Sequence, residues 1–388
     1  MDIARYSAEE RQALLPWANA RIPVPPAPPG VPPGATAAPG GPPAPSAQAD
    51  PHPAARTRER VRGMLLGLAI GDALGNTSEG LTPSQRRHIH GEVRDYLPNR
   101  REEMAAVGLP SDDTQLTFWT LESLLRRRGL DPADLADTFT RRDRIYGIGS
   151  TLTEFLFAYR FGGRRWFEAG RPSAGNGALM RIAPVILPHL RNMTRGLWVD
   201  VVAATVLTHR NEAAVSASAG FVGVLAECLA WPGEEAPVAR WWPETFLRYA
   251  RPVETGVRYR PRVPDDPFEG SLCDRVAQEV SAAVAAAESV LTAGGRWYSG
   301  ACLLETVPCA LHVLARHAGD PEGALVRAVN DTTDNDTIAA IVGAAVGALH
   351  GEGALPSRWR DGLLGRTREE DDGHVQELID QAVEAFAA

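Results

Sequence analysis

The segment GMLLGLAIGDALG (residues 63–75) carries a glycine at every fourth position, and most residues between the glycines are apolar. This period predicts a helix that continues from a basic stretch at 56–62 and ends at Gly75. Positions four apart share one helical face, and a glycine inside a helix costs roughly 1 kcal/mol relative to alanine. Four glycines on one face therefore predict that another backbone or a ligand approaches this helix closely.

Two carboxylates belong to this helix and to the loop that follows it. Asp72 lies beside the glycine stripe, where a buried carboxylate needs partners. It either caps a neighbouring helix or supports a metal site without binding the metal, and the local sequence favours neither alternative. Glu79 lies in a turn-rich loop, where it is either a solvated side chain or an acid or base that the loop brings to a substrate.

Two acidic clusters carry the main chemical signal. Ser111-Asp112-Asp113-Thr114 and Thr333-Asp334-Asn335-Asp336-Thr337 each precede an apolar run. Alone, each cluster is typical of a helix start, because Asp and Ser are preferred N-cap residues. Together they supply carboxylate and hydroxyl oxygens, which hard cations such as Mg²⁺ and Mn²⁺ prefer, so we predict that they form one metal site. The residues that follow Asp336 exclude an EF-hand loop.

The rest of the chain is predicted to be helical. Helical periods or helix-start signals occur at 116–125, from 131, at 152–159, at 201–230 with an interruption at 208–211, and at 274–293, 302–316, 338–350 and 374–386. Residues 231–272 are rich in Pro, Trp and Arg and lack a steady period, which predicts an irregular excursion from the core. No convincing strand pattern occurs, so the predicted fold class is all-α.

A glycine-rich turn and a histidine are further candidates for a binding site. Gly175-Asn176-Gly177 permits positive φ and exposes backbone N–H groups, so it can cradle an anionic or hydroxylated ligand, although Asn-Gly is also a common tight turn. His209 interrupts an apolar helical stretch. A histidine in that position is more often a structural hydrogen-bonding group than a ligand contact.

Residues 1–55 differ in composition from the remainder. Fourteen of the chain's 31 prolines lie between Pro16 and Pro53, mixed with Gly, Ala and Ser. After one short helix within 2–20, this segment is expected to be an extended or flexible arm outside the catalytic domain at 56–388. The alternative is a tethered segment that docks on a protein partner through Leu14, Leu15 and Trp17.

The overall composition bounds the class of protein. The chain has 388 residues, 44% of them hydrophobic, and a net charge of −8, which argues against nucleic acid or an anionic membrane as the main partner. Its four cysteines form no C-x-x-C pair and are expected to be buried, reduced thiols. The N-terminus lacks the pattern of a secretion signal, and the longest apolar runs, at 64–75 and 338–349, are too short to span a bilayer. We therefore expect a cytoplasmic protein.

Six motifs in one order resemble the ADP-ribosylglycohydrolase family, which includes the dinitrogenase-reductase-activating glycohydrolases and the ADP-ribosyl-arginine and ADP-ribosyl-serine hydrolases. They are GLAIGDALG (67–75), SDDTQ (111–115), YGIG (146–149), GNGALMR (175–181), Thr208-His209 and DNDTIA (334–339). The resemblance covers about residues 57–350. It implies an all-α, compact orthogonal helical bundle with a two-metal Mg²⁺ centre, or one with Mn²⁺, at the base of a cleft.

The resemblance also implies roles for individual residues. The implied metal ligands are Ser111, Asp112, Asp113, Asp334, Asp336 and Thr337. The positions implied to line an ADP-ribose cleft are Tyr146, Gly147, Ser173, Gly175, Asn176, Gly177 and His209. The implied catalytic carboxylates are Glu79, Asp113 and Asp334. Two positions depart from the family pattern: Thr332-Thr333 replaces a pair of glycines, and Ala174 replaces an aromatic residue that stacks on adenine in some members.

The activity implied by the resemblance is hydrolysis of the N- or O-glycosidic bond between ADP-ribose and a protein side chain, with arginine favoured. Two metals would hold the vicinal ribose hydroxyls and activate a water, while a carboxylate takes its proton. The alternative is an immunity or inhibitor protein that binds an ADP-ribosylating toxin through residues 1–55, with or without hydrolase activity.

Overall fold

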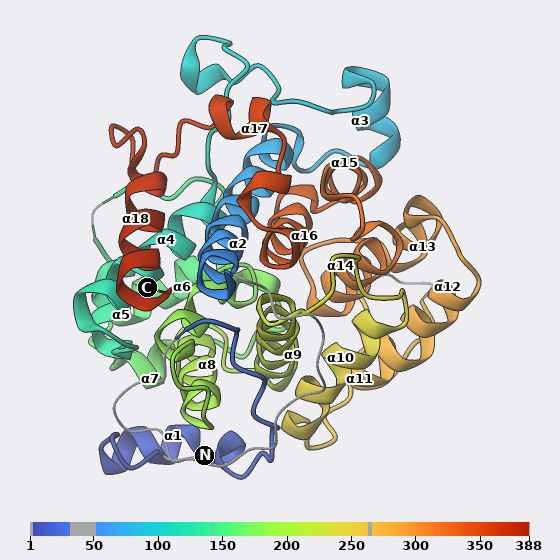
Figure 1. Cartoon of the computed structure of the whole chain (residues 1–388). Coiled ribbons are helices and arrows are strands. Elements are labelled where there is room, and N and C mark those ends of the chain that lie inside the picture. The colour runs from blue at the N-terminus through green and yellow to red at the C-terminus, as the bar shows by residue number, and fades with distance from the viewer. Residues whose placement is uncertain (1–2, 32–51, 142, 263–265, 388) are drawn as a thin grey trace.

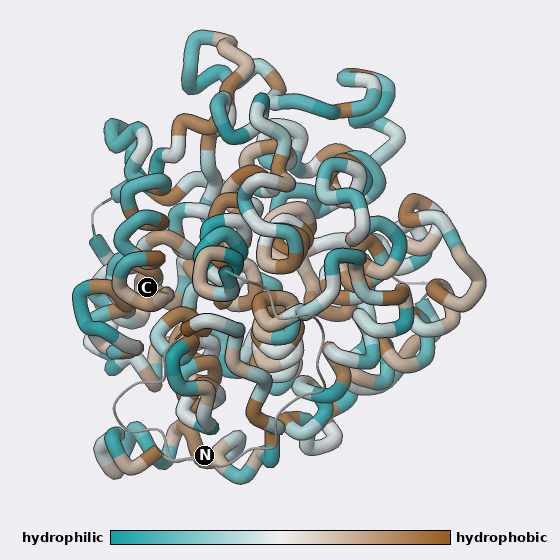
Figure 2. The backbone as a smooth tube through the Cα atoms, in the orientation of Figure 1, coloured by the Kyte–Doolittle hydropathy of each residue, from teal (hydrophilic) through white to brown (hydrophobic). Residues whose placement is uncertain are grey.

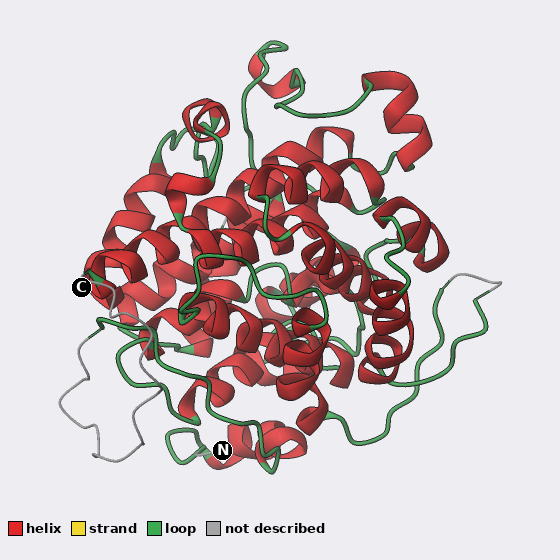
Figure 3. Ribbon diagram, turned by 45° about the vertical axis from the view of Figure 1, so that its right-hand side comes forward, coloured by secondary structure: helices red, strands yellow, loops and turns green. Residues whose placement is uncertain are grey.

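The computed structural model describes residues 3–31, 52–141, 143–262 and 266–387, and within them it is built from α-helices joined by loops and short 3₁₀ or π turns (Figure 3). β-pairing in these ranges is limited to isolated bridges. The all-α prediction is therefore confirmed. The helices are α1 (Ala8–Ala18), α2 (Pro53–Gly75), α3 (Pro83–His90), α4 (Asp112–Arg127), α5 (Pro132–Phe139), α6 (Ser150–Arg160), α7 (Trp166–Ala169), α8 (Gly196–Val206), α9 (Glu212–Leu229), α10 (Trp241–Ala250), α11 (Leu272–Arg275), α12 (Ser281–Ala285), α13 (Val290–Trp297), α14 (Leu303–His317), α15 (Pro321–Asp331), α16 (Asn335–His350), α17 (Ser357–Gly362) and α18 (His374–Ala382).

Helices α2 and α16 lie side by side in the middle of the molecule, and their backbones touch along the glycine stripe (Figure 1). A Cβ atom built on any of the four glycines would come closer than 3 Å to the α16 backbone. The distances are 2.5 Å from Gly63 to Gly347 O, 2.2 Å from Gly67 to Gly343 O, 2.1 Å from Gly71 to Ala339 O and 2.4 Å from Gly75 to Asp336 Cα. The predicted close approach is confirmed, and the approaching backbone is that of a second helix.

The other helices surround this pair. Helices α9, α14 and α15 pack against α16, and α8 and α10 pack against α9. Apolar residues gather on the helices at the centre of the molecule (Figure 2). Helix α9 is long and apolar enough to cross a membrane by length and composition, but 94% of it is buried inside the structure, as expected for a core helix. All four cysteines are free and buried, as predicted.

Two predicted segments differ from the structure. The helix expected over 274–293 is broken, because α12 ends at Ala285, Ala287 adopts a φ of 51°, and the Ser289 side chain accepts a hydrogen bond from Thr292 N that starts α13. The excursion expected over 231–272 contains helix α10, in which Trp242, Phe246 and Tyr249 are buried. The aromatic residues of α10 recur at helical spacing, but the surrounding Pro and Arg residues obscure this period.

The N-terminal segment is partly ordered against the rest of the chain. Helix α1 packs against α7 and α8, and both Leu14 and Trp17 belong to the hydrophobic core, whereas Leu15 is exposed. Two of the three side chains named in the partner-docking alternative are therefore packed against the chain itself. Residues 32–51, the centre of the predicted proline-rich arm, lie outside the described residues.

Candidate active site

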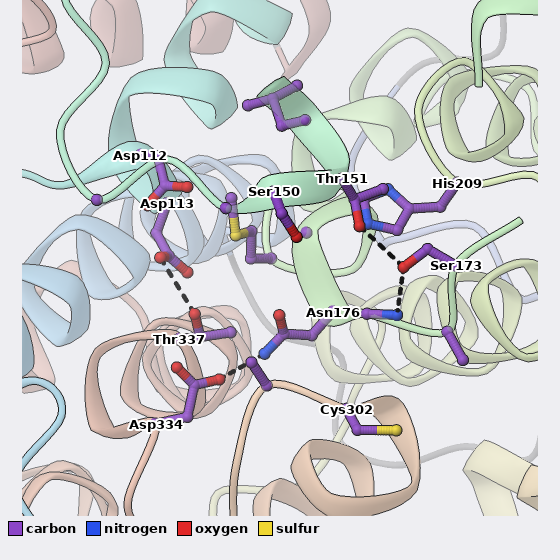
Figure 4. Close-up of a pocket in the computed structure, with 18 of the residues that line it drawn as sticks. Asp112, Asp113, Ser150, Thr151, Ser173, Asn176, His209, Cys302, Asp334 and Thr337 are labelled. Atoms are coloured by element: carbon purple, nitrogen blue, oxygen red, sulfur yellow. Dashed lines mark hydrogen bonds between the residues drawn. The ribbon is translucent and has the colours of Figure 1, made fainter. Parts of the chain in front are cut away.

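The two acidic clusters meet at the N-terminal ends of α4 and α16. Ser111 and Asp334 are the N-cap residues of these helices, which confirms that both clusters are helix starts. Neither side chain accepts a capping hydrogen bond in the described structure. Figure 4 shows Asp112 and Asp113 on one side of the site and Asp334 and Thr337 on the other. The carboxylates are thus left available for another use.

Asp72 performs the capping that the acidic clusters do not. Its carboxylate accepts hydrogen bonds from Ser111 N and Thr114 N, at 2.9 and 3.0 Å, and also from both hydroxyl groups and from Asn76 Nδ2. A carboxylate has about four lone-pair positions, so these five donors leave none of them free for another partner. Asp72 therefore caps α4 and supports the site from behind, so the two alternatives for this residue coexist.

The carboxylates form two groups that share Asp336. One oxygen from each of Asp72, Asp113 and Asp336 lies within 4.8 Å of the other two, and the same holds for Glu79, Asp334 and Asp336. Asp336 belongs to both groups, and acids as close as these could hold a divalent cation. The lone pairs of Asp72 are already used by its donors, so Asp72 would support such a site without binding the cation. The helix-start signals did not reveal this arrangement, because it depends on α2 and α16 being in backbone contact.

The electrostatics of these groups favour a bound cation. Burial, with the neighbouring carboxylates adding to it, raises the pKa of Asp112 to about 8 and that of Asp334 to about 7. The pKa values of Asp113 and Asp336 are raised well above the usual range for the same two reasons. Carboxylates this close repel one another when ionised, and a divalent cation between them removes that cost.

The donor set also fits a divalent cation. Asp113 Oδ1 is buried and makes no hydrogen bond with any described group. The hydroxyl groups of Ser111 and Thr337 donate their hydrogens to Asp72 and Asp113, at 2.7 and 3.2 Å, so their oxygen lone pairs remain free. Buried oxygen atoms with free lone pairs are what Mg²⁺ and Mn²⁺ require.

A cleft of about 470 Å³ opens above the carboxylates. Its far wall is formed by Ser173, the Gly175-Asn176-Gly177 turn and His209, and Gly147 lines it beside Asp112 (Figure 4). Ser173 Oγ accepts hydrogen bonds from Thr151 Oγ1 and Gly175 N, at 2.9 and 3.1 Å. The structure therefore brings most of the expected substrate-binding positions to one cavity.

His209 is held by neighbouring polar groups. Arg181 donates to Thr208 Oγ1 at 2.7 Å, and that oxygen lies 2.9 Å from His209 Nδ1. A hydroxyl group has two lone pairs and one hydrogen, so Thr208 Oγ1 can pair with Nδ1 in either tautomer of the imidazole. Burial, with a smaller contribution from the Arg181 charge, lowers the pKa of His209 to about 3. His209 is therefore a neutral imidazole on the wall of the cleft.

Two of the expected substrate-binding residues, Tyr146 and Asn176, make contacts that were not expected from the sequence. The Tyr146 ring is not part of the cleft wall; it packs under Arg101 and Arg144 and lines a separate cavity. Asn176 lines the cleft, but its amide nitrogen donates to Asp334 Oδ2 at 2.5 Å. Tyr146 and Gly147 lie in the same loop, but only Gly147 lines the cleft.

The sequence reading missed two sets of residues near the site. Buried Arg86 donates to Ser78 Oγ, to Leu81 O and to Thr332 O, so it ties the loop that carries Glu79 to the segment before α16. The second set, Tyr259, Arg260 and Arg262, comes from the predicted excursion and lines the cleft. Nothing local marks these residues, because their place at the site depends on segments far away in the sequence, as with the bond from Arg86 to Thr332 O.

An all-α fold with a buried carboxylate centre at the base of a cleft defines a class of metal-dependent hydrolases. Residues 53–388 match the profile of one family in this class, the ADP-ribosylglycohydrolases, and the chain belongs to that family. It is therefore an enzyme of the ADP-ribosylglycohydrolase type.

Relatives and a solved structure agree with this assignment. An uncharacterized protein from Archaeoglobus fulgidus is 31% identical over 79% of this chain and 92% of its own length. The ADP-ribosylarginine hydrolase Tri1 of Pseudomonas putida is 26% identical over 78% and 73%, and the ADP-ribosylhydrolase ARH3 of Homo sapiens is 27% identical over 84% and 94%. A solved ADP-ribosylglycohydrolase-related protein complex superposes with a TM-score of 0.62 at 28% identity, covering 86% of this chain and 98% of the other.

Proposed function

We propose that this protein hydrolyses the glycosidic bond between ADP-ribose and a protein side chain in a Mg²⁺-dependent reaction, with arginine as the favoured side chain. The observation that carries the proposal is the set of neighbouring carboxylates that line the cleft, namely Glu79, Asp113, Asp334 and Asp336. The similarity to an ADP-ribosylarginine hydrolase supports the choice of arginine.

The groups that would hold the cations are the oxygens already described. They are the side chains of Ser111, Asp112, Asp113, Asp334, Asp336 and Thr337. Two Mg²⁺ ions, or two Mn²⁺ ions, would supply Lewis-acid chemistry there, aligning the vicinal hydroxyls of a ribose and lowering the pKa of water. Asn176, which donates to Asp334, holds that carboxylate in place.

The far wall of the cleft suits the remainder of ADP-ribose. The N–H group of Gly177 and the hydroxyl group of Ser173 offer donors to a diphosphate without a strong positive charge. His209 adds a neutral imidazole next to the glycine turn. Gly147 has a φ of 83°, and a Cβ there would lie 3.0 Å from Asp112 Oδ1, so a glycine keeps this edge of the cleft open.

The reaction breaks the bond between the anomeric carbon and a guanidinium nitrogen. The water oxygen bonds to that carbon, one water proton passes to a carboxylate, and the nitrogen leaves with a proton, so the carboxylate returns to its starting state. We assign the proton transfer to Glu79, because it lines both the cleft and the cavity beside it. Asp113 and Asp334 are the other carboxylates that we expect to act on the water.

The test is release of ADP-ribose from an ADP-ribosylarginine peptide with Mg²⁺, with Mn²⁺ or with EDTA. We expect release with either metal and none with EDTA. Asp113→Asn and Asp336→Asn should each lower kcat/KM by roughly 10³-fold, a loss of about 4 kcal/mol of transition-state stabilisation. The matched control is Asp361→Asn in α17, an exposed carboxylate far along the chain, which should behave like the wild type. Metal-independent turnover would refute the proposed mechanism.

A further inference from the structure

A second cavity, of about 550 Å³, adjoins the cleft. The two cavities share Glu79, Arg262, Ala301 and Asp334. Glu79 and Asp334 line both cavities, so a ribose held over these carboxylates would have the second cavity next to it. Thr333, one of the two threonines that replace the family's glycines, lines this cavity and not the cleft.

Glu305 is the unusual residue of the second cavity. Its side chain is only 1% exposed, and neither carboxylate oxygen makes a hydrogen bond with a described group. Burial raises the pKa of Glu305, and the Arg262 charge and the nearby backbone N–H groups of Cys302 and Arg262 offset only part of that rise. A buried carboxylate without hydrogen bonds is costly unless a cation compensates it.

The nearest cation is a guanidinium of the chain itself. Arg262 Nε lies 3.7 Å from Glu305 Oε1, beyond hydrogen-bonding distance, and the Arg262 side chain is 64% exposed. The other arginine nearby, Arg275, is fully buried and paired with Asp266 and Glu279. The carboxylate thus attracts a guanidinium that is loosely held and open to solvent.

The remaining wall of the second cavity suits a flat cation. Tyr298 and Ser299 both have positive φ, at 70° and 49°, and the exposed Tyr298 ring lines the cavity beside Gly300. Consecutive left-handed residues other than glycine are strained and occur most often where a site requires them. An aromatic ring next to a carboxylate is a suitable surface for a guanidinium, which stacks on rings and pairs with carboxylates.

We propose that the second cavity binds the guanidinium of the arginine leaving group, and that Glu305 is the residue that selects it. This inference rests on the proposed function. It assigns Glu305 to substrate selection and not to the chemical step, because Glu305 belongs to neither carboxylate group. The plainer reading is that Glu305, in the first turn of α14, only stabilises the helix N-terminus.

The test compares Glu305→Gln with the wild type in three measurements. For an ADP-ribosylarginine peptide with Mg²⁺, kcat/KM should fall by about tenfold or more, as expected when a charge-assisted hydrogen bond is lost. ADP-ribose would occupy the cleft and not the second cavity, so its Kd should change less than about twofold. Methylguanidinium should bind the wild type and inhibit it, and it should do neither with the variant.

Two further variants complete the test. Arg262→Ala removes the competing guanidinium, so methylguanidinium should bind it several-fold more tightly than it binds the wild type. Glu370→Gln, at an exposed glutamate, should match the wild type throughout. If Glu305→Gln weakens ADP-ribose binding as much as it weakens turnover, or binds methylguanidinium normally, then Glu305 has only a structural role. If the wild type cleaves no arginine linkage, the proposed function fails, and the methylguanidinium measurements alone decide the inference.

Discussion

Replacing Gly67 by alanine should destabilise the protein strongly, because the new Cβ atom would lie 2.2 Å from the carbonyl oxygen of Gly343. Non-bonded carbon contacts are optimal near 3.5–4.0 Å, so α16 would have to move by more than about 1 Å. The atoms that collide belong to the backbones of two helices packed on all sides, and no flexible side chain can move away. Overpacking of this kind costs about 3 kcal/mol.

This free energy converts into a measurable melting temperature. Unfolding entropy is about 2.1 cal/mol/K per residue near 60 °C, which for 388 residues is roughly 0.8 kcal/mol/K. A loss of 3 kcal/mol therefore lowers Tm by about 4 °C. The assay is thermal unfolding followed by circular dichroism, with urea denaturation as a second measure of the same free energy.

A matched control is available in α13. Gly295 is also a helical glycine, but no described atom lies within 4 Å of a Cβ built on it. Gly295→Ala should stabilise the protein by about 0.5–1 kcal/mol, since alanine is the better helix former. If Gly67→Ala and Gly295→Ala both raise Tm, the backbone contact between α2 and α16 does not exist and the reasoning fails.

The position along the stripe should matter as well. Gly75 faces Asp336, whereas Gly63 faces the opposite end of α16 at Gly347. Both Gly63→Ala and Gly75→Ala should lower Tm, but only Gly75→Ala should also weaken Mg²⁺ binding, because it displaces a carboxylate of the centre. Equal loss of Mg²⁺ affinity in both variants would contradict this distinction.

Three other perturbations test separate parts of the structure. Mg²⁺ at about a hundred times its Kd should stabilise the protein by about 2.7 kcal/mol in a thermal-shift assay, and EDTA or Asp336→Asn should abolish the effect. His209 has a pKa of about 3 in the folded state, below its unfolded value of about 6.5, so its contribution to stability is complete above pH 6.5 and declines as the pH falls towards 3. At pH 5 the loss should be about 2 kcal/mol, and urea denaturation of His209→Gln should lack it. Trp17→Ala should cost about 3 kcal/mol because the ring is buried, whereas Leu15→Ala, at an exposed position, should stay within about 0.5 kcal/mol; unfolding in urea compares the two.

The fold class and the helix starts could be predicted because their signals are local. The glycine stripe required a close neighbour, and Asp131 before Pro132 was an N-cap that the structure confirms. What could not be predicted was the identity of the neighbour. A stripe of glycines indicates that another segment packs closely against the helix, but it does not identify that segment. The helix that packs there begins more than two hundred and fifty residues later.

The same reason explains which residues of the site could be predicted from the sequence and which could not. The aspartates of both clusters were identified from their chemistry, and the structure brings them together. The family resemblance assigned both Tyr146 and Gly147 to the cleft, although only Gly147 lines it. Arg86 and Glu305 were missed, since an arginine in a basic stretch and a glutamate in the first turn of a helix are ordinary local features. Their roles arise from segments that only the folded chain places beside them.

The backbone contact between α2 and α16 also has a consequence for how this enzyme can change. Asp336 lies on one of two helices in direct backbone contact, whereas the second cavity is lined by Tyr298, Gly300 and Arg262, which lie in loops outside that contact. Loops can be exchanged without altering the distance between two locked helices. The proposed site of substrate selection and the shared carboxylate therefore lie on separate parts of the molecule, and an engineer who wished to retarget it would rebuild the loops and leave the glycines untouched.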